Sequence, residues 1–316
     1  MKSIAIWYKP KGNLQKSLNE VELHFNLWKL PISPSKYTRF IDVGIKLENT
    51  TNISQLKIYL PFKIAKGDFT DIVDKFITRP DLVSAIFNEN YKTTSDGRSK
   101  THKITDSNDN FIFNIYQTSD ADIAINHQFN GTTIIINCQE SDEKTYFRFR
   151  INGDYLHSLS DIQKPSNAVV QSAFSKIELI DFRVNETRDL DLDLLECIKN
   201  EKALRIKKAH FFFICSSNED VLGSHKPYVS CRNLENYRWL NYVGQEKLNP
   251  KQIFLAYHWT QGGNVEESKP DFGILIKSKF ESNNWRTILV YILGLAVLAI
   301  LFNIVSQSII NWINCK

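Results

Sequence analysis

The sequence predicts an α+β, β-rich fold: a mostly antiparallel, sandwich-like cytosolic domain followed by one C-terminal transmembrane helix. Three observations lead to this class. Short runs in the first two-thirds of the chain alternate apolar and polar residues, as half-buried strands do. Asn130-Gly131 separates two such runs, and Asn-Gly favours a hairpin because both residues tolerate positive φ. From Thr287 through Cys315 the chain carries no charged residue and no histidine.

Residues 1–160 are expected to form a β-rich cytosolic domain. Two helical segments, Asp68–Ile77 and Asp81–Asn88, interrupt its strands around Arg79-Pro80, and the polar stretch Asn90–Asp109 is expected to be an exposed loop. The alternating runs place strands at Ser3–Tyr8, Val21–Leu30, Phe40–Leu47, Leu56–Ile64, Asn110–Gln117, Asp122–Gln128, Thr132–Cys138 and Thr145–Ile151.

Residues 161–175 are polar, contain Pro165, and are expected to be a connection. Residues 176–282 are then expected to form a mixed α/β cytosolic part that packs on the first. Its apolar runs predict strands at Ser175–Asn185, Ala209–Ser216, Gln252–Thr260 and Phe272–Phe280, and helices at Asp189–Asn200 and Arg232–Tyr242.

The transmembrane helix is expected over residues 286–310, because about 20 apolar residues cross the hydrocarbon core of a bilayer. Trp285 and Trp312 bracket it, about 40 Å apart along a helix, and tryptophan favours the two membrane interfaces. Arg286 can extend its charge to the nearer interface. The alternative is a buried core helix, but so long an uncharged terminal stretch is hard to bury on every side.

Basic residues before the helix set its expected orientation. Four lie on its N-terminal side and only Lys316 lies beyond it, which favours a cytoplasmic N-terminal domain on the inner (plasma) membrane in a single-pass topology. The opening residues contain no signal-peptide pattern, and the five widely spaced cysteines form no disulfide framework, so a reducing cytosol is expected. The four basic residues are Lys269, Lys277, Lys279 and Arg286.

One face of the helix combines small and amide side chains. Small residues let helices approach closely, and amides can form hydrogen bonds across a helix interface in lipid, so this stripe predicts self-association and a homo-oligomer. In the alternative interpretation the polar residues lie in the headgroup layer, and Asn303, the deepest amide, decides between the two. The helix-association stripe consists of Ala296, Ala299, Asn303, Ser306 and Gln307.

Composition and motifs exclude several functions. The net charge is only +4 in 316 residues, and the densest basic run (Lys202, Arg205, Lys207, Lys208) is interpreted as a solvated face, so no nucleic acid partner is expected. No phosphate-binding glycine motif and no metal-ligand spacing occur, so no catalytic residue, metal or cofactor is assigned. His210 and Cys215 are five residues apart, and on a strand they would point to opposite faces.

Three functional hypotheses remain. The first is a membrane-anchored cytosolic sensor or effector that binds a protein or small-molecule ligand, self-associates through its helix and perturbs the lipid bilayer. The second is a passive tail-anchored scaffold that recruits a protein partner to the inner membrane. The third is an enzyme with a dispersed active site. A cytosolic module joined to a minimal transmembrane element is similar in plan to membrane effectors of bacterial antiviral systems, although this resemblance covers no specific residues.

Overall fold

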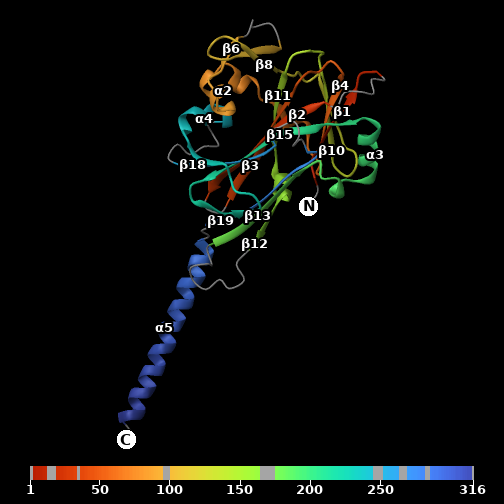
Figure 1. Cartoon of the computed structure of the whole chain (residues 1–316). Coiled ribbons are helices and arrows are strands. Elements are labelled where there is room, and N and C mark those ends of the chain that lie inside the picture. Colours follow the sequence, from red (N-terminus) through yellow and green to blue (C-terminus); the bar gives the residue numbers. More distant parts are fainter. Residues whose placement is uncertain are drawn as a thin grey trace.

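Three β-sheets and a C-terminal helix make up the computed structural model, which describes residues 3–12, 19–33, 36–94, 100–163, 175–244, 252–262, 269–281 and 285–314 (Figure 1). The β-rich fold with antiparallel and mixed sheets confirms the predicted fold class. Most neighbouring strands run antiparallel. Two pairs are parallel: β2 (Glu20–Ser33) with β15 (Arg205–Ser216), and β8 (Phe111–Tyr116) with β11 (Thr145–Asn152).

The largest sheet follows the order β17-β18-β15-β2-β3-β11-β8-β7-β6, with β5 paired to β11. Its central strands β2 and β15 come from the two ends of the domain, so residues on either side of the polar 161–175 segment share one sheet. The strands are β2 (Glu20–Ser33), β3 (Lys36–Leu47), β5 (Phe69–Asp71), β6 (Lys92–Thr94), β7 (Thr101–Thr105), β8 (Phe111–Tyr116), β11 (Thr145–Asn152), β15 (Arg205–Ser216), β17 (Ser230–Leu234) and β18 (Phe254–Gly262).

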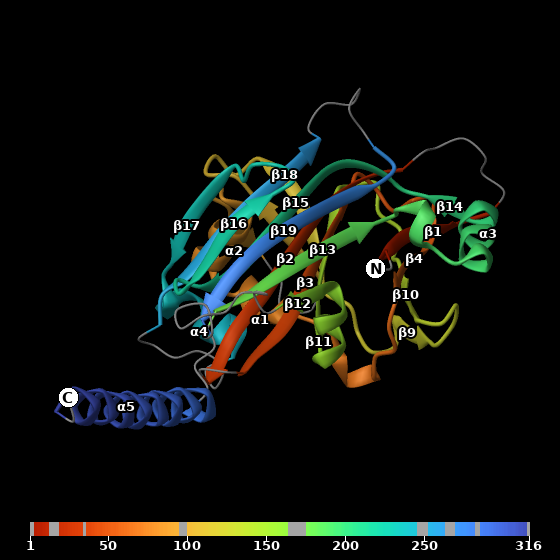
Figure 2. The ribbon, with the colours of Figure 1, turned by 90° about the horizontal axis from the view of Figure 1, so that it is seen from below.

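Two smaller sheets cover one face of this large sheet (Figure 2). Alternate residues of β2 and β15, such as Phe25 and Phe211, are fully buried between the layers and form the main core with residues of both smaller sheets. One small sheet contains β14 (Lys202–Ala203), β1 (Ala5–Pro10), β4 (Ile53–Leu60), β10 (Thr132–Asn137) and β9 (Ile123–Asn126); the other contains β12 (Ser160–Gln163), β13 (Ser175–Val184), β19 (Phe272–Glu281) and β16 (Glu219–Ser224).

Short helices cover the opposite face of the large sheet. They are α1 (Asp74–Ile77), α2 (Pro80–Phe87) and α4 (Asn236–Val243), and they pack in a second core around Trp28 and Phe76. A further helix, α3 (Leu192–Asn200), packs Leu194 against Trp7 and Tyr59 on the outer face of the five-stranded sheet. The described residues also contain three short 3-10 turns: η1 (Lys66–Asp68), η2 (Asp154–Leu159) and η4 (Thr187–Asp189).

Some sequence-based assignments were wrong where short polar strands lie at or next to the edge of a sheet. The expected loop Asn90–Asp109 contains β6 and β7, and the expected connection begins with β12, whose four residues are Ser, Asp, Ile and Gln. Such strands are stabilised by pairing with a neighbour, so their own sequences show little apolar alternation. The expected helix Arg232–Tyr242 is strand β17 followed by α4, and the expected helix Asp68–Ile77 includes β5.

The Asn130-Gly131 hairpin is confirmed, with its turn one residue earlier than expected. β9 and β10 pair antiparallel, and the residues with positive φ are Phe129 and Asn130. Gly131 has a different role: a Cβ on it would lie 2.2 Å from the backbone oxygen of Leu60. The glycine therefore permits close approach of the hairpin to β4.

We expect Gly131→Ala to destabilise the domain by about 1–3 kcal/mol, because the added methyl group must displace backbone rather than a flexible side chain. The measurement is urea unfolding followed by tryptophan fluorescence. Gly67→Ala is the matched control, since nothing lies within 4 Å of the position of its Cβ. Equal effects from the two substitutions would contradict the close-approach explanation.

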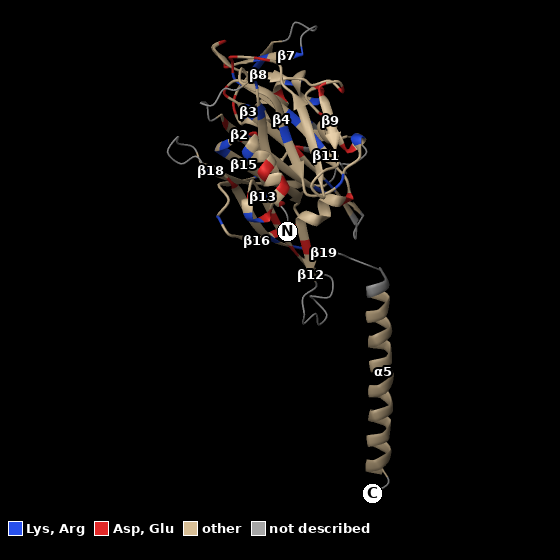
Figure 3. Ribbon diagram, turned by 90° about the vertical axis from the view of Figure 1, so that its right-hand side faces the viewer, with Lys and Arg blue, Asp and Glu red and all other residues tan. Residues whose placement is uncertain are grey.

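The C-terminal helix α5 (Trp285–Asn314) extends away from the sheets (Figures 1 and 3). Its segment Ile288–Asn314 is long and apolar enough to span a membrane, and none of its most apolar window is buried within the protein. This exposure argues against the core-helix alternative, because an isolated apolar surface of this length is unstable in water. The helix is consistent with a single-pass membrane protein, and it is longer than the expected range 286–310.

Candidate ligand-binding site

A cavity of about 270 Å³ lies between the large sheet and the end of α2. The pleat of the sheet creates it: His24 on β2 and His210 on β15 are register partners, and both point away from the main core. His258 on β18 lies beside Phe212, the next residue on the same face of β15. We call this space the histidine cavity; its lining residues are His24, Ala85, Ile86, Phe87, Asn88, Glu89, Lys208, His210, Phe212, Ser230, Arg232 and His258.

The imidazole rings form a contiguous aromatic wall. Nδ1 of His210 lies 2.9 Å from Nε2 of His258, so one neutral ring donates a hydrogen bond to the other. The rings of His258 and Phe212 are stacked with centroids 4.2 Å apart, and the ring centroids of His24 and His210 are 4.9 Å apart. Rings from three strands are thus held by one another and by the sheet.

Burial keeps these histidines neutral. Burial, and to a smaller extent the cation Lys208, lowers the pKa of His210 to about 3 and that of His258 to about 4. The pKa of His24 is also well below its usual value because of burial, with further lowering by His210, Arg148, Lys46 and Lys208. Two cations, Lys208 and Arg232, line the cavity together with one carboxylate, Glu89, so the lining carries a net positive charge while its imidazoles remain uncharged at neutral pH.

A second, more open depression of about 600 Å³ adjoins the cavity and shares four lining residues with it: Ala85, Asn88, Glu89 and Arg232. We call it the α2–α4 groove, because residues of both helices line it. Arg232 donates a hydrogen bond to the backbone oxygen of Ala85 and so marks the boundary between the two spaces. Trp239 also lines the groove; its side chain is 4% exposed, and its indole Nε1 has no hydrogen-bond partner among the described residues.

A buried charge network lies under the wall of the cavity. Asp42 on β3 accepts hydrogen bonds from Arg150 Nε at 2.6 Å and from the Tyr242 hydroxyl at 2.7 Å. Arg148 on β11 donates to the hydroxyls of Tyr242 and Tyr146, at 2.8 and 2.7 Å. The ring of Tyr146 lies against that of His24, with centroids 5.7 Å apart. Because two buried guanidiniums face one carboxylate here, the network adds to the positive potential of the cavity.

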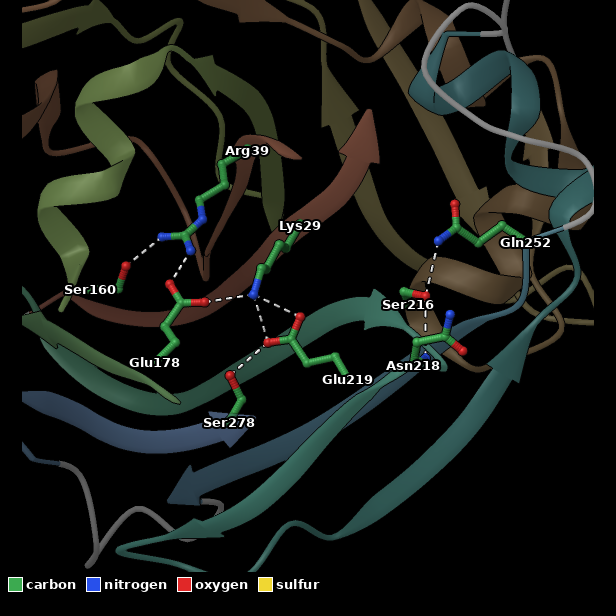
Figure 4. A network of polar contacts seen from close by, with 9 residues as sticks. All are labelled: Lys29, Arg39, Ser160, Glu178, Ser216, Asn218, Glu219, Gln252 and Ser278. Atoms are coloured by element: carbon green, nitrogen blue, oxygen red, sulfur yellow. Dashed lines mark hydrogen bonds and ion pairs between the residues drawn. The ribbon is translucent and has the colours of Figure 1, made fainter. Parts of the chain in front are cut away.

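A second buried network joins the large sheet to the sheet that leads into α5 (Figure 4). Lys29 near the end of β2 is 2.7 Å from Glu178 on β13 and 2.8 Å from Glu219 on β16. Ser278 on β19 donates to Glu219 at 2.6 Å, and Arg39 on β3 pairs with Glu178. The Lys29 ammonium also lies 3.5 Å from the ring centroid of Phe280 on β19. We call this set the interlayer network.

The low pKa of His210 predicts a specific dependence of stability on pH. The unfolded chain binds a proton at this ring below about pH 6.5, whereas the folded chain does not until about pH 3. Stability is therefore complete above pH 6.5 and falls as the pH drops, by about 2 kcal/mol from this ring between pH 7.5 and pH 5. Urea unfolding at the two pH values measures the difference, which should be smaller in His210→Asn. Phe212→Leu changes the same cavity without removing a titrating group and should keep the wild-type difference.

The structure places the residues that the sequence singled out in separate regions. His210 lines the cavity, whereas Cys215 lies in the main core with a raised pKa owing to burial, so their predicted opposite orientation is confirmed. Cys231 is exposed on β17 and is not among the cavity residues. Within the described residues, no group of three or more His, Cys, Asp or Glu side chains is arranged to hold a metal ion.

The membrane residues lie on α5, apart from the cavity. Trp312 is exposed, whereas the side chains of Trp285 and Arg286 lie outside the described residues. The stripe falls on one continuous helix and is exposed in this single chain; its role in association stays a prediction. It comprises Ala296, Ala299, Asn303, Ser306 and Gln307.

Sequence reasoning missed the histidine cavity as a whole. Its residues come from positions 24, 85–89, 208–212, 230–232 and 258, which no motif spacing connects. Lys208 belongs to the basic run that was interpreted as a solvated face, yet it lines the cavity. The available signal was the alternation within β2, where His24 falls on the face opposite Leu23 and Phe25; β15 is apolar on both faces from Phe211 to Ile214 and gave no such signal.

No model of a known protein family matches this chain, and no curated protein matches it at a significant level. Function is therefore inferred from residues and geometry.

Proposed function

We propose that this protein is a membrane-anchored sensor and effector, whose domain binds a ligand on the cytoplasmic side of the inner membrane and whose α5 helices associate to perturb the bilayer. Its similarity in plan to membrane effectors of bacterial antiviral systems makes antiviral defence the biological role we propose. The observation that carries the proposal is that one strand, β2, contributes both to the histidine cavity and to the interlayer network.

The path from cavity to anchor is short. His24 and Lys29 are five residues apart on β2, about 17 Å along the strand, and they point to opposite faces of the sheet. Lys29 contacts Glu219, which accepts from Ser278 on β19. A ligand that shifts β2 at His24 would therefore change the ion pairs that hold β19.

The link between domain and anchor also supports this mechanism. β19 ends at Glu281 and α5 begins at Trp285, so even a fully extended chain separates them by only about 14 Å. Movement or clustering of the domains is then transmitted to the helices. Inside lipid, Asn303 would meet its counterpart in a second copy, where amides form interhelical hydrogen bonds.

The test is expression of the full chain in bacterial cells with measurement of membrane potential and growth. We expect depolarisation that is lost on truncation after Asn284 and strongly reduced by Asn303→Leu. Asn311→Leu is the matched control: it makes the same change two turns closer to the end of α5, and we expect it to retain activity. If Asn303→Leu and the truncation both leave toxicity or protection unchanged, the effector proposal fails.

Exchange of α5 for an unrelated poly-leucine span separates this proposal from the passive scaffold. A scaffold needs only attachment to the membrane, so any apolar anchor should support it. An effector whose helices associate through specific side chains should lose its activity in the exchange. Full activity with the poly-leucine span would favour the scaffold.

One observation favours an enzyme as the second candidate: the cavity brings the hydrogen-bonded pair His210 and His258 together with the carboxylate Glu89. A neutral imidazole can act as a general base, and a nearby carboxylate can orient a reacting group or accept a proton from it. Incubation of the purified chain with a panel of phosphate and carboxylate esters, followed by NMR, tests this activity. Turnover that is lost in both His258→Asn and Glu89→Gln would favour the enzyme; its absence across the panel would count against it.

A further inference from the structure

We propose that the histidine cavity and the α2–α4 groove together bind a mononucleotide-like ligand, a planar heterocycle that carries a phosphate. The inference rests on the proposed function, because it names the class of ligand that the sensor recognises. It depends on three features of the described residues: an aromatic wall, cations at its ends, and a donor in the adjoining groove.

The aromatic wall suits a flat ring. Phe212, His258 and His210 form a stack whose neighbouring centroids are 4.2 and 5.1 Å apart, and Phe87 contributes a further ring from α2. Aromatic side chains bind nucleobases by stacking, without requiring one particular base. Because the histidines are neutral, their ring nitrogens can also donate to and accept from the edge of a heterocycle.

The cations suit a phosphate. Lys208 lies two residues before His210 on β15, and Arg232 lies two residues after Ser230 on β17, so the two positive groups flank the rings. Both lower the pKa of His258, after the larger effect of burial, which shows that their potential reaches the cavity. Guanidinium and ammonium groups are the side chains that proteins use to bind phosphate.

Size and acidic residues favour a small ligand over a nucleic acid strand. The groove of about 600 Å³ is in the range that holds small molecules, and the adjoining cavity adds about 270 Å³. Trp239 lines the groove, and its buried indole Nε1 is a donor that has no partner among the described residues and that a ligand oxygen would satisfy. Glu89, Asp81 and Glu235 line the groove as well, and they would repel a long polyanion that followed it.

The experiment is isothermal titration calorimetry on the full chain in detergent with four probes: AMP, UMP, adenosine and inorganic phosphate. We expect at least one mononucleotide to bind at least tenfold more tightly than adenosine or phosphate alone, because ring and phosphate contacts add in one ligand. Binding should also raise the melting temperature in proportion to the logarithm of ligand concentration.

Three variants assign the contacts. Lys208→Met should weaken AMP binding at least tenfold and leave adenosine binding unchanged, because it removes only a phosphate contact. Phe212→Leu should weaken both, because it removes a stacking surface. Lys199→Met is the control: it removes an exposed lysine on α3, on the outer face of the five-stranded sheet, and should change neither.

Two results would overturn the proposal. One is that neither mononucleotide binds with a Kd below about 1 mM. The other is that inorganic phosphate alone binds as tightly as AMP, which would indicate a simple anion site. If the chain depolarises membranes but binds no nucleotide, the proposed ligand class is wrong and the effector proposal stands. A chain that binds AMP but has no effect on membranes contradicts the effector proposal and retains the ligand class.

Discussion

Replacement of Lys29 by methionine is expected to destabilise the domain by about 3–5 kcal/mol, because it removes one partner from a buried ion network. Lys29 lies between Glu178 and Glu219, and all three are nearly inaccessible to solvent. Without the ammonium, Glu178 still has Arg39, but Glu219 retains only the hydroxyl of Ser278 among the contacts described here. The measurement is urea unfolding at pH 7.5 with tryptophan fluorescence.

The loss should depend on pH in a defined direction. Burial already raises the pKa of Glu219, and loss of Lys29 raises it further. An acid with a raised pKa in the folded state is uncharged at low pH and becomes a buried charge as the pH rises, so the destabilisation should be smaller at pH 5 than at pH 7.5. Glu219→Gln should rescue part of the loss when it is combined with Lys29→Met.

Lys92→Met is the matched control for this substitution. Lys92 pairs with Asp109 at 2.8 Å, nearly the same distance, but both side chains are more than half exposed. Exposed pairs contribute little, so we expect a change within about 0.5 kcal/mol. If Lys29→Met is as mild as Lys92→Met, the interlayer network does not hold the two sheets together, and the proposed route from cavity to anchor loses its support.

Asp42→Asn is expected to cost about 3–5 kcal/mol, because it leaves the buried guanidiniums of Arg148 and Arg150 without their carboxylate. Asp42 accepts three hydrogen bonds, two from Arg150 and one from the Tyr242 hydroxyl. An asparagine has the same shape but carries no charge and offers a single acceptor oxygen. Thermal unfolding of the full chain in detergent measures the loss of stability.

Asp109→Asn removes a carboxylate from the exposed pair with Lys92 and is the control for Asp42→Asn, with an expected change within about 0.5 kcal/mol. The Asp42 substitution should also weaken ligand binding in the histidine cavity. Tyr146, which accepts from Arg148, packs against His24, so a displaced arginine would disturb the wall of the cavity. A stable Asp42→Asn protein with unchanged binding would show that the network supports neither the fold nor the cavity.

The sequence alone predicted the features that depend on local pattern. Alternation located the long strands β2, β3 and β11, because a half-buried strand must place apolar residues at every second position. The uncharged segment that forms most of α5 was equally clear, since no water-soluble surface and few cores accept so long a run of such residues. Short edge strands such as β6 and β12 escaped detection, because pairing rather than composition stabilises them.

Only the tertiary structure decided where the polar residues meet. Alternation within β2 places His24 on the non-core face of its strand, but nothing in the sequence shows that β2 and β15 are parallel neighbours in a register that brings His24 beside His210. The pairing is non-local: 186 positions separate the two histidines, and side-chain contacts at such a separation follow from the order of strands in the sheet. The same strand order brings Lys29 into contact with Glu178 and Glu219. It therefore assembles the cavity and the two buried networks from residues that are far apart in the sequence.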